Sequence, residues 1–144
     1  MKILRGILSL VLVMLCAAPA LAAGGALMHY DADLDDRASL QRGARLFVNY
    51  CLSCHSAAYM RFNRLGRDLG IPEEVLLENL MFGTDKPGDT MTVAMQPQDA
   101  ERWFGVAAPD LSVTARARGD DWLYSYFMTF YRDPKRPTGA NNLQ

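Results

Sequence analysis

Two thiols and an imidazole lie within five consecutive residues of this chain, Cys51-Leu52-Ser53-Cys54-His55. Cysteines three residues apart on one turn of backbone can each add to one of the two vinyl groups at a porphyrin edge. The histidine that follows is then carried beneath the ring, where its imidazole can bind the iron as proximal ligand. The spacing therefore matches the attachment motif of a c-type haem.

Other uses of paired cysteines fit the chain less well. A redox-active C-x-x-C motif of the thioredoxin kind expects a βαβ context, with a helix opening at the first cysteine, whereas the helical pattern here runs into Cys51 from upstream. A structural zinc site needs four ligands, and the chain after its leader offers two cysteines, His29 and His55. His29 is expected to be a solvated histidine of the N-terminal segment. A disulfide remains open, but it gives no role to His55.

Residues 1–22 have the composition of a secretory signal peptide. A basic region with Lys2 and Arg5 is followed by an apolar run and a small-x-small cleavage signal that ends at Ala22. We therefore expect one domain over residues 23–144. Export agrees with the haem motif, because a c-type haem is joined to its protein on the far side of the bacterial inner membrane.

The charge balance disfavours nucleic acid as a partner. Removal of Lys2 and Arg5 leaves 13 of the 15 basic side chains against 16 acidic ones, a net charge of about −3. Hydrophobic residues make up 50% of the sequence, which is enough apolar content for the core of one domain. No apolar run near 20 residues follows the leader, so we expect no membrane span within the chain as given.

Helices dominate the expected secondary structure, and the predicted fold class is all-α. Residues 39–50 predict the first helix, because apolar side chains share one face at three- and four-residue spacing: Leu40, Ala44, Phe47, Val48 and Cys51. Gly43 lies on this face and costs about 1 kcal/mol in a helix, so it indicates a close approach of another backbone. A glycine at this place is typical of c-type cytochromes, where the last helix crosses it. Further helices are expected over residues 72–81, 97–104, 108–118 and 121–131, with loops over 83–97 and 132–144 and no strands.

Blocks of sequence outside the haem motif resemble one family, cytochrome c1 of proteobacterial type. They cover nearly the whole chain after the leader: Leu40-Gln41-Arg42-Gly43-Ala44, Tyr59-Met60-Arg61-Phe62-Asn63-Arg64-Leu65, Trp103-Phe104-Gly105, Pro109-Asp110-Leu111-Ser112, Arg116-Ala117-Arg118, Asp121-Trp122-Leu123-Tyr124 and Tyr131-Arg132-Asp133-Pro134. The resemblance implies a c-type cytochrome fold, in which short helices wrap around one covalently bound haem c.

The resemblance also implies which residues hold the haem: Cys51, Cys54, His55, Pro109, Leu111 and Arg118. The two cysteines would carry the thioether bonds, and His55 would bind the iron with its other ring nitrogen held by a backbone carbonyl near Pro109. The Pro109 region would pack against the ring, and Arg118 would reach a propionate. The chain has Ala108-Pro109 where the family usually has Pro-Pro, so the ring packing there is expected to differ slightly.

The family's distal methionine and its membrane helix follow later than Gln144. The distal iron ligand is therefore expected to lie outside these residues, as in a cytochrome c1 truncated at its C-terminus. Of the methionines in the long loop, Met91 and Met95 are flexible enough to reach the iron, although a buried or solvated role is expected for both.

The function that the resemblance implies is that of the haem-c subunit of the cytochrome bc1 complex, a quinol:cytochrome c oxidoreductase. Such a subunit takes an electron from the Rieske iron–sulfur protein and passes it to a cytochrome c, beside cytochrome b at the periplasmic face of the bacterial inner membrane. It carries electrons and does no substrate chemistry. A free-standing periplasmic cytochrome c and a haem protein with an open iron position that binds a ligand remain as alternatives.

Overall fold

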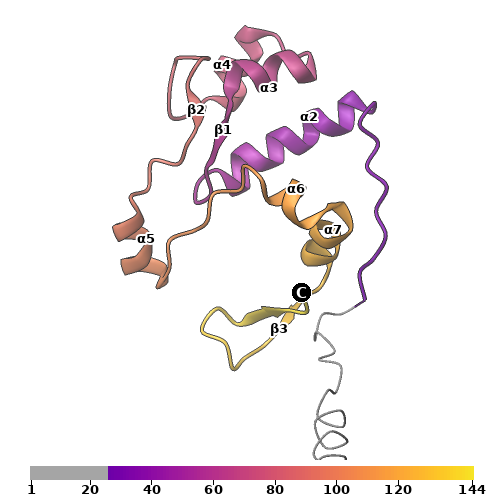
Figure 1. Cartoon of the computed structure of the whole chain (residues 1–144). Coiled ribbons are helices and arrows are strands. Elements are labelled where there is room, and N and C mark those ends of the chain that lie inside the picture. Colours follow the sequence, from indigo (N-terminus) through magenta and orange to yellow (C-terminus); the bar gives the residue numbers. More distant parts are fainter. Residues whose placement is uncertain (1–25) are drawn as a thin grey trace, which may run out of the picture.

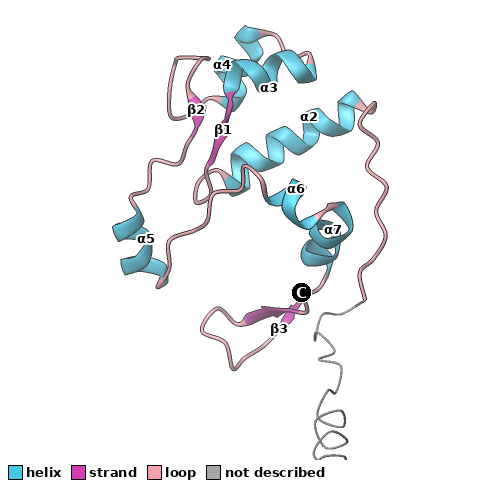
Figure 2. Ribbon diagram, in the orientation of Figure 1, coloured by secondary structure: helices cyan, strands magenta, loops and turns pink. Residues whose placement is uncertain are grey.

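The structure is a computed structural model that describes residues 26–144, and the expected signal peptide lies outside this range. Short helices form most of its regular structure (Figures 1 and 2). They are α2 (Arg37–Leu46), the π-helix η1 (Phe47–Cys51), α3 (Phe62–Leu69), α4 (Glu73–Leu80), α5 (Pro97–Phe104), α6 (Thr114–Arg118) and α7 (Asp120–Met128). The strands are β1 (Ala57–Arg61), β2 (Thr90–Met91), β3 (Phe130–Arg132) and β4 (Ala140–Asn142).

The four strands correct the prediction of an all-α chain. They pair as two separate antiparallel ribbons, β1 with β2 and β3 with β4. β2 lies within the predicted loop 83–97, and β4 lies within the predicted loop 132–144. The helix predicted over residues 121–131 ends earlier, at Met128, because Phe130 to Arg132 pair with the β4 strand instead.

The helix predicted over residues 39–50 is present and leads directly into the haem motif. The side chain of Asp36 caps it by accepting a hydrogen bond of 2.9 Å from the Ser39 N–H. From Phe47 the chain winds as the π-helix η1, which ends at Cys51. A π-helix is rare and often occurs at functional sites.

Gly43 lacks the close neighbour that its place in this helix predicted. A Cβ atom built on Gly43 would have nothing within 4 Å. The close approach occurs instead at Gly66 of α3, where a Cβ atom would lie 3.2 Å from Leu76 Cδ2 and 3.3 Å from the carbonyl oxygen of Ile71. Gly66 therefore permits the tight packing of α3 on α4.

The hydrophobic core gathers where η1, α3, α4 and β2 meet, toward the top of Figure 1. Its buried side chains are Val48, Phe62, Leu76, Leu80, Met81 and Met91. Met91 is only 2% exposed, so of the two roles expected for this methionine, buried or solvated, the structure shows the buried one. The sequence did not predict α3, which begins at the buried Phe62. Gly70 caps its C-terminal end, and the φ of 64° at this residue suits glycine.

The second half of the chain carries few buried side chains. Between residues 97 and 144 the structure buries Ala100 of α5 and Ser125 of α7. The predicted α5 is confirmed, and Gly105 caps its C-terminal end. The helix predicted from residue 108 begins later, at Thr114, and the segment before it is irregular.

The N-terminal segment, residues 26–36, is fastened to α7. The Met28 N–H donates to Ser125 Oγ at 2.7 Å, and the Tyr30 N–H donates to Asp121 Oδ1 at 2.8 Å. His29 is solvated as expected, with 83% of its side chain exposed, although its Nδ1 also lies 3.2 Å from Asp121 Oδ1. Across residues 26–144, no helix has both the length and the hydropathy that a membrane crossing requires.

Candidate functional site

The haem motif forms one tight turn at the end of η1. Both Cys54 and His55 donate their backbone N–H groups to the carbonyl oxygen of Cys51, at 3.0 and 2.8 Å. Cys51 and Cys54 are free thiols and half-buried. Burial raises the pKa of the Cys51 thiol above its ordinary value of 9.0, so this thiol is protonated at neutral pH.

His55 is held by a residue far along the chain. Its Nδ1 lies 2.8 Å from the carbonyl oxygen of Pro109. Because a carbonyl oxygen only accepts hydrogen bonds, Nδ1 must carry a proton, and in the neutral imidazole the lone pair is then on Nε2. This is the tautomer that a metal-binding histidine needs, and the carbonyl expected near Pro109 is that of Pro109 itself.

Residues 109–112, which we call the proximal segment, run beside the residues that follow the haem motif. The Leu111 N–H donates to the carbonyl oxygen of Ser56 at 2.7 Å. The Asp110 carboxylate accepts from the Ala58 N–H at 2.9 Å and from the Ser112 N–H at 2.8 Å. Ser112 Oγ accepts from the Tyr59 N–H at 3.1 Å. The hydrogen bond from the Ser112 side chain lowers the pKa of Asp110, and the two backbone N–H groups lower it further.

Asp110 and Ser112 were not among the site residues expected from the sequence. Their spacing is that of a local turn in which an aspartate accepts the N–H group two residues ahead. That signal indicates a turn, but it does not show that the same carboxylate also binds β1. Pro109 and Leu111, which were expected at the site, both lie in the proximal segment.

Arg118 is exposed at the end of α6. Its guanidinium carbon lies 4.8 Å from the ring centroid of Trp122, a cation–π distance. Within residues 26–144 it makes no ion pair with a carboxylate. Trp122 is in turn stacked on Tyr126, with ring centroids 5.1 Å apart. The cation is therefore ordered by an aromatic ring and retains its capacity to bind an anion.

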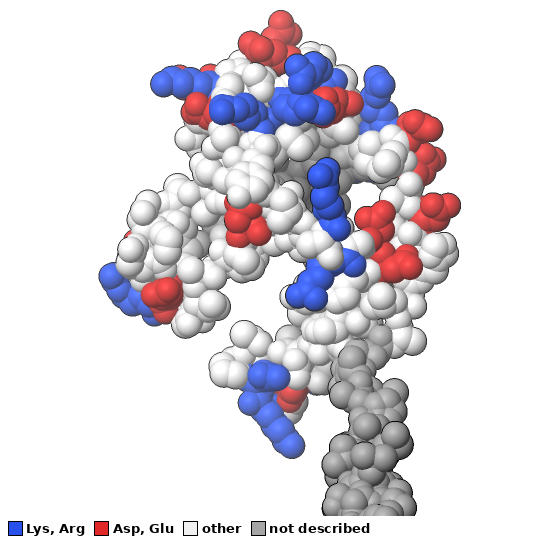
Figure 3. Space-filling view, viewed as in Figure 1, with Lys and Arg blue, Asp and Glu red and all other residues white. Residues whose placement is uncertain are grey.

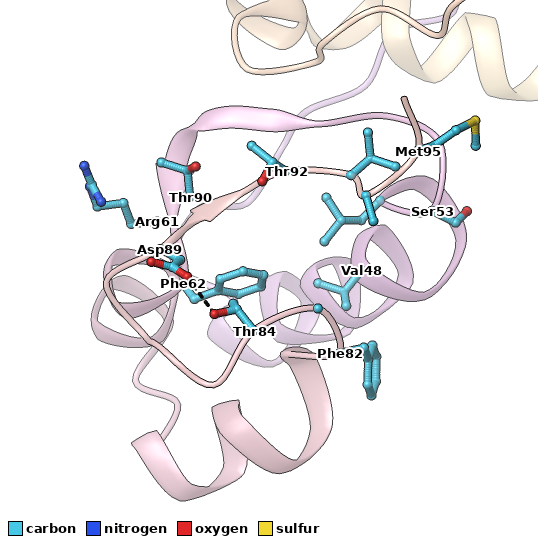
Figure 4. Close-up of a pocket in the computed structure, with 14 residues that line it drawn as sticks. Val48, Ser53, Arg61, Phe62, Phe82, Thr84, Asp89, Thr90, Thr92 and Met95 are labelled. Carbon is cyan, nitrogen blue, oxygen red and sulfur yellow. Dashed lines mark hydrogen bonds between the residues drawn. The ribbon is translucent and has the colours of Figure 1, made fainter. Parts of the chain in front are cut away.

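Two adjoining cavities lie near the haem motif. The larger has a volume of about 700 Å³ and is lined by residues that include Val48, Phe62 and Thr84, but by neither cysteine of the motif (Figure 4). The smaller has a volume of about 340 Å³, and its lining includes Cys54 and Asp110. Met95 lines both cavities. Cys54 thus lines the smaller cavity, whereas Leu52 and Ser53, the two residues between the cysteines, line the larger one.

Large apolar side chains stay exposed in the second half of the chain. They include Trp103, Phe104, Val106, Val113, Phe127 and Phe130. Figure 3 shows an open bay between α5 and the β3–β4 hairpin, bordered mainly by uncharged residues. Exposed apolar surface on this scale indicates a bound group or a partner. A porphyrin is flat and apolar and has two carboxylates, so it matches a site with two thiols, an imidazole and apolar surroundings. These features define the chain as a c-type cytochrome.

Comparison with known proteins narrows the class to a family. A model of the Cytochrome C1 family matches residues 27–80. Cytochrome c1 of Allochromatium vinosum is 53% identical to this chain over 133 residues, which cover 90% of the chain and 54% of the relative. The chain belongs to the cytochrome c1 family, and the cofactor of that family is one covalently bound haem c.

Two further relatives carry other names. The ammonia monooxygenase gamma subunit of Nitrosomonas europaea is 54% identical over 111 residues, 77% of this chain and 47% of the relative. Cytochrome b/c1 of Bradyrhizobium diazoefficiens is 28% identical over 122 residues, 68% of this chain and 18% of the relative. The chain spans about half the length of the first two curated relatives.

Proposed function

We propose that this chain is the haem-c electron-transfer subunit of a bc1-type quinol:cytochrome c oxidoreductase. The observation that carries the proposal is the 2.8 Å hydrogen bond from His55 Nδ1 to the Pro109 carbonyl. His55 directly follows Cys54, the second of two free thiols. The hydrogen bond leaves Nε2 as an iron ligand at the place where the thiols attach a porphyrin. Membership of the cytochrome c1 family supports the bc1 assignment.

Each residue of the site has a defined part in this proposal. The Cys51 and Cys54 thiols would hold the haem through thioether bonds to its two vinyl groups, formed by addition reactions that need no oxidant. His55 Nε2 binds the iron. The exposed guanidinium of Arg118 pairs with a propionate, and Pro109 and Leu111 pack against the ring. The bound haem supplies one-electron chemistry without a substrate of its own.

The partners follow from the same assignment. The donor is a Rieske iron–sulfur protein, the acceptor is a cytochrome c, and cytochrome b is the membrane-embedded neighbour, as the likeness to a cytochrome b/c1 supports. The site of action is the periplasmic face of the bacterial inner membrane, reached by export with a signal peptide over residues 1–22. Attachment to the membrane comes through the complex or through a C-terminal helix.

The first test is covalent attachment. The chain is expressed with a haem-attachment system, and the denatured protein is expected to keep its haem on a gel. Replacement of both Cys51 and Cys54 by Ala should abolish that staining. Complete loss of colour from the wild-type chain on acid–acetone extraction contradicts the assignment.

The second test is electron transfer. The ferric holoprotein should be reduced by a reduced Rieske fragment and reoxidised by a soluble cytochrome c in stopped-flow mixing. Rapid carbon monoxide binding by the reduced form together with no exchange with either partner would favour the ligand-binding alternative.

The ammonia monooxygenase gamma subunit among the relatives supplies a second candidate, in which the same haem site serves a different oxidoreductase. Isolation of the native complex by a tag on this chain separates the two. Co-purification of cytochrome b and a Rieske protein supports the first, and co-purification of monooxygenase subunits supports the second.

A further inference from the structure

We propose that Asp110 is a positioning residue of the haem site, which aims the Pro109 carbonyl at His55 Nδ1 and thereby sets the electron-donating strength of the iron ligand. The inference rests on the proposed function, because it concerns how His55 acts once it binds iron. Asp110 need not touch the haem to do this. It acts through the peptide group that it shares with Pro109.

The geometry of the carboxylate supports this role. Asp110 Oδ2 accepts from the Ala58 N–H of β1 at 2.9 Å, and Oδ1 accepts from the Ser112 N–H of its own segment at 2.8 Å. The Asp110 side chain therefore makes one hydrogen bond within the proximal segment and one to β1, the strand that follows the haem motif. Ala58 is three residues after His55. Asp110 therefore connects the stretch of chain that carries His55 to the peptide group whose carbonyl accepts from His55 Nδ1.

Planarity of the peptide bond carries the effect to Pro109. The Pro109 carbonyl and the Asp110 N–H belong to one rigid plane, so fixing Asp110 fixes the direction of the carbonyl. Pro109 cannot anchor itself, because proline has no N–H group to donate. The remaining anchors are the Leu111 N–H on Ser56 at 2.7 Å and the Tyr59 N–H on Ser112 Oγ at 3.1 Å, and neither belongs to the Pro109–Asp110 peptide.

The consequence for the iron follows from the ligand's basicity. A carbonyl that accepts from Nδ1 makes Nε2 a stronger donor, and a stronger donor favours ferric over ferrous iron. Without Asp110 the carbonyl should drift from Nδ1 and the one-electron equilibrium should move toward the reduced form. We expect a shift of up to about tenfold, which is about 59 mV for one electron.

The test compares three variants of the holoprotein, matured with covalent haem. Asp110→Ala removes both acceptors, and Asp110→Asn keeps one oxygen acceptor and loses the other. Asp133→Ala is the matched control, because Asp133 also accepts a local N–H, from Lys135 at 3.0 Å, and a second group, the amide of Asn141 at 3.2 Å, but in the β3–β4 hairpin. The measurements are the midpoint potential and the iron–histidine stretching frequency after photolysis of bound carbon monoxide.

The expected order is a raised potential and a lowered iron–histidine frequency in Asp110→Ala, a smaller change of both in Asp110→Asn, and no change in Asp133→Ala. Wild-type values in Asp110→Ala overturn the inference while leaving the proposed function intact, as do equal shifts in Asp133→Ala. If Asp110→Ala fails to mature, Asp110→Asn decides by the same criteria. A wild-type chain that attaches no haem contradicts the proposed function, and the inference falls with it.

Discussion

His55 shows how much of this site depends on contacts between distant residues. Its Nδ1 hydrogen bond joins it to a carbonyl 54 residues further along the chain. Cys51 and Cys54, by contrast, are placed by a local turn. The motif therefore predicts the attachment chemistry from the sequence, whereas the bridging role of Asp110 depends on how the proximal segment folds onto β1.

Replacement of His55 tests the ligand directly. His55→Ala should keep the haem on both thioethers and lose the absorption spectrum of a histidine-ligated iron, because no other residue stands in that position. Imidazole added to the solution should restore it. His29→Ala is the control, since His29 is 83% exposed and is expected to leave the spectrum unchanged. A normal spectrum in His55→Ala would remove this residue from the site.

Asp110 should also make the stability of the folded state depend on pH in the acid range. Its hydrogen bonds lower its pKa below the ordinary value of 3.8, so the folded state favours the carboxylate. The stabilisation is fully present when the pH is above the pKa of Asp110 in the unfolded state. It is lost as the pH falls through the pKa of Asp110 in the folded state. Wild type should therefore exceed Asp110→Asn in denaturant midpoint at pH 7, and the difference should shrink below about pH 3.8. A difference that does not change with pH would contradict this origin.

At the scale of elements, the sequence predicts helices better than strands. Helix α5 has a proline at its start and a glycine at its end, and the pattern alone locates it. β2 has only two residues, too few to show an alternation of apolar and polar side chains, and its partner β1 lies before α3 and α4 in the chain. The sequence also failed to predict α3, whose buried face consists of Phe62 and Gly66, too few apolar residues for a clear period.

The two helix glycines give a matched test of packing. Gly66→Ala should destabilise the fold by roughly 1 kcal/mol, because the new Cβ would press on Leu76 Cδ2 at 3.2 Å and on a backbone carbonyl at 3.3 Å. Gly43→Ala should stabilise it by roughly 0.5–1 kcal/mol through helix propensity, since nothing lies within 4 Å of that site. Chemical denaturation of the holoprotein measures both. A destabilised Gly43→Ala would mean that another backbone does approach Gly43.

Buried apolar side chains are distributed unevenly over the described part of the molecule. The core lies among η1, α3, α4 and β2, while α5, α6 and α7 lie around the open bay (Figures 1 and 3). Helices α5 and α7 keep large aromatic side chains exposed, namely Trp103, Phe104 and Phe127. Buried apolar area is the main favourable term in folding. The helices around the bay therefore need a further apolar group to pack against, and in the proposed function that group is the haem.

Removal of the attachment cysteines should expose this difference. In the Cys51→Ala, Cys54→Ala double variant, amides of α3 and α4 should stay protected from hydrogen exchange, because Phe62 of α3 and Leu76 of α4 are buried without any cofactor. Amides of α5, α6 and α7 should exchange faster, on the order of a hundredfold, because Ala100 and Ser125 are the buried side chains of those helices. Mass spectrometry of peptides from the holoprotein and the variant measures both. The single Cys51→Ala variant, which keeps one thioether, should resemble the holoprotein. Equal protection of the two regions in the double variant would show that α5 to α7 fold without the haem.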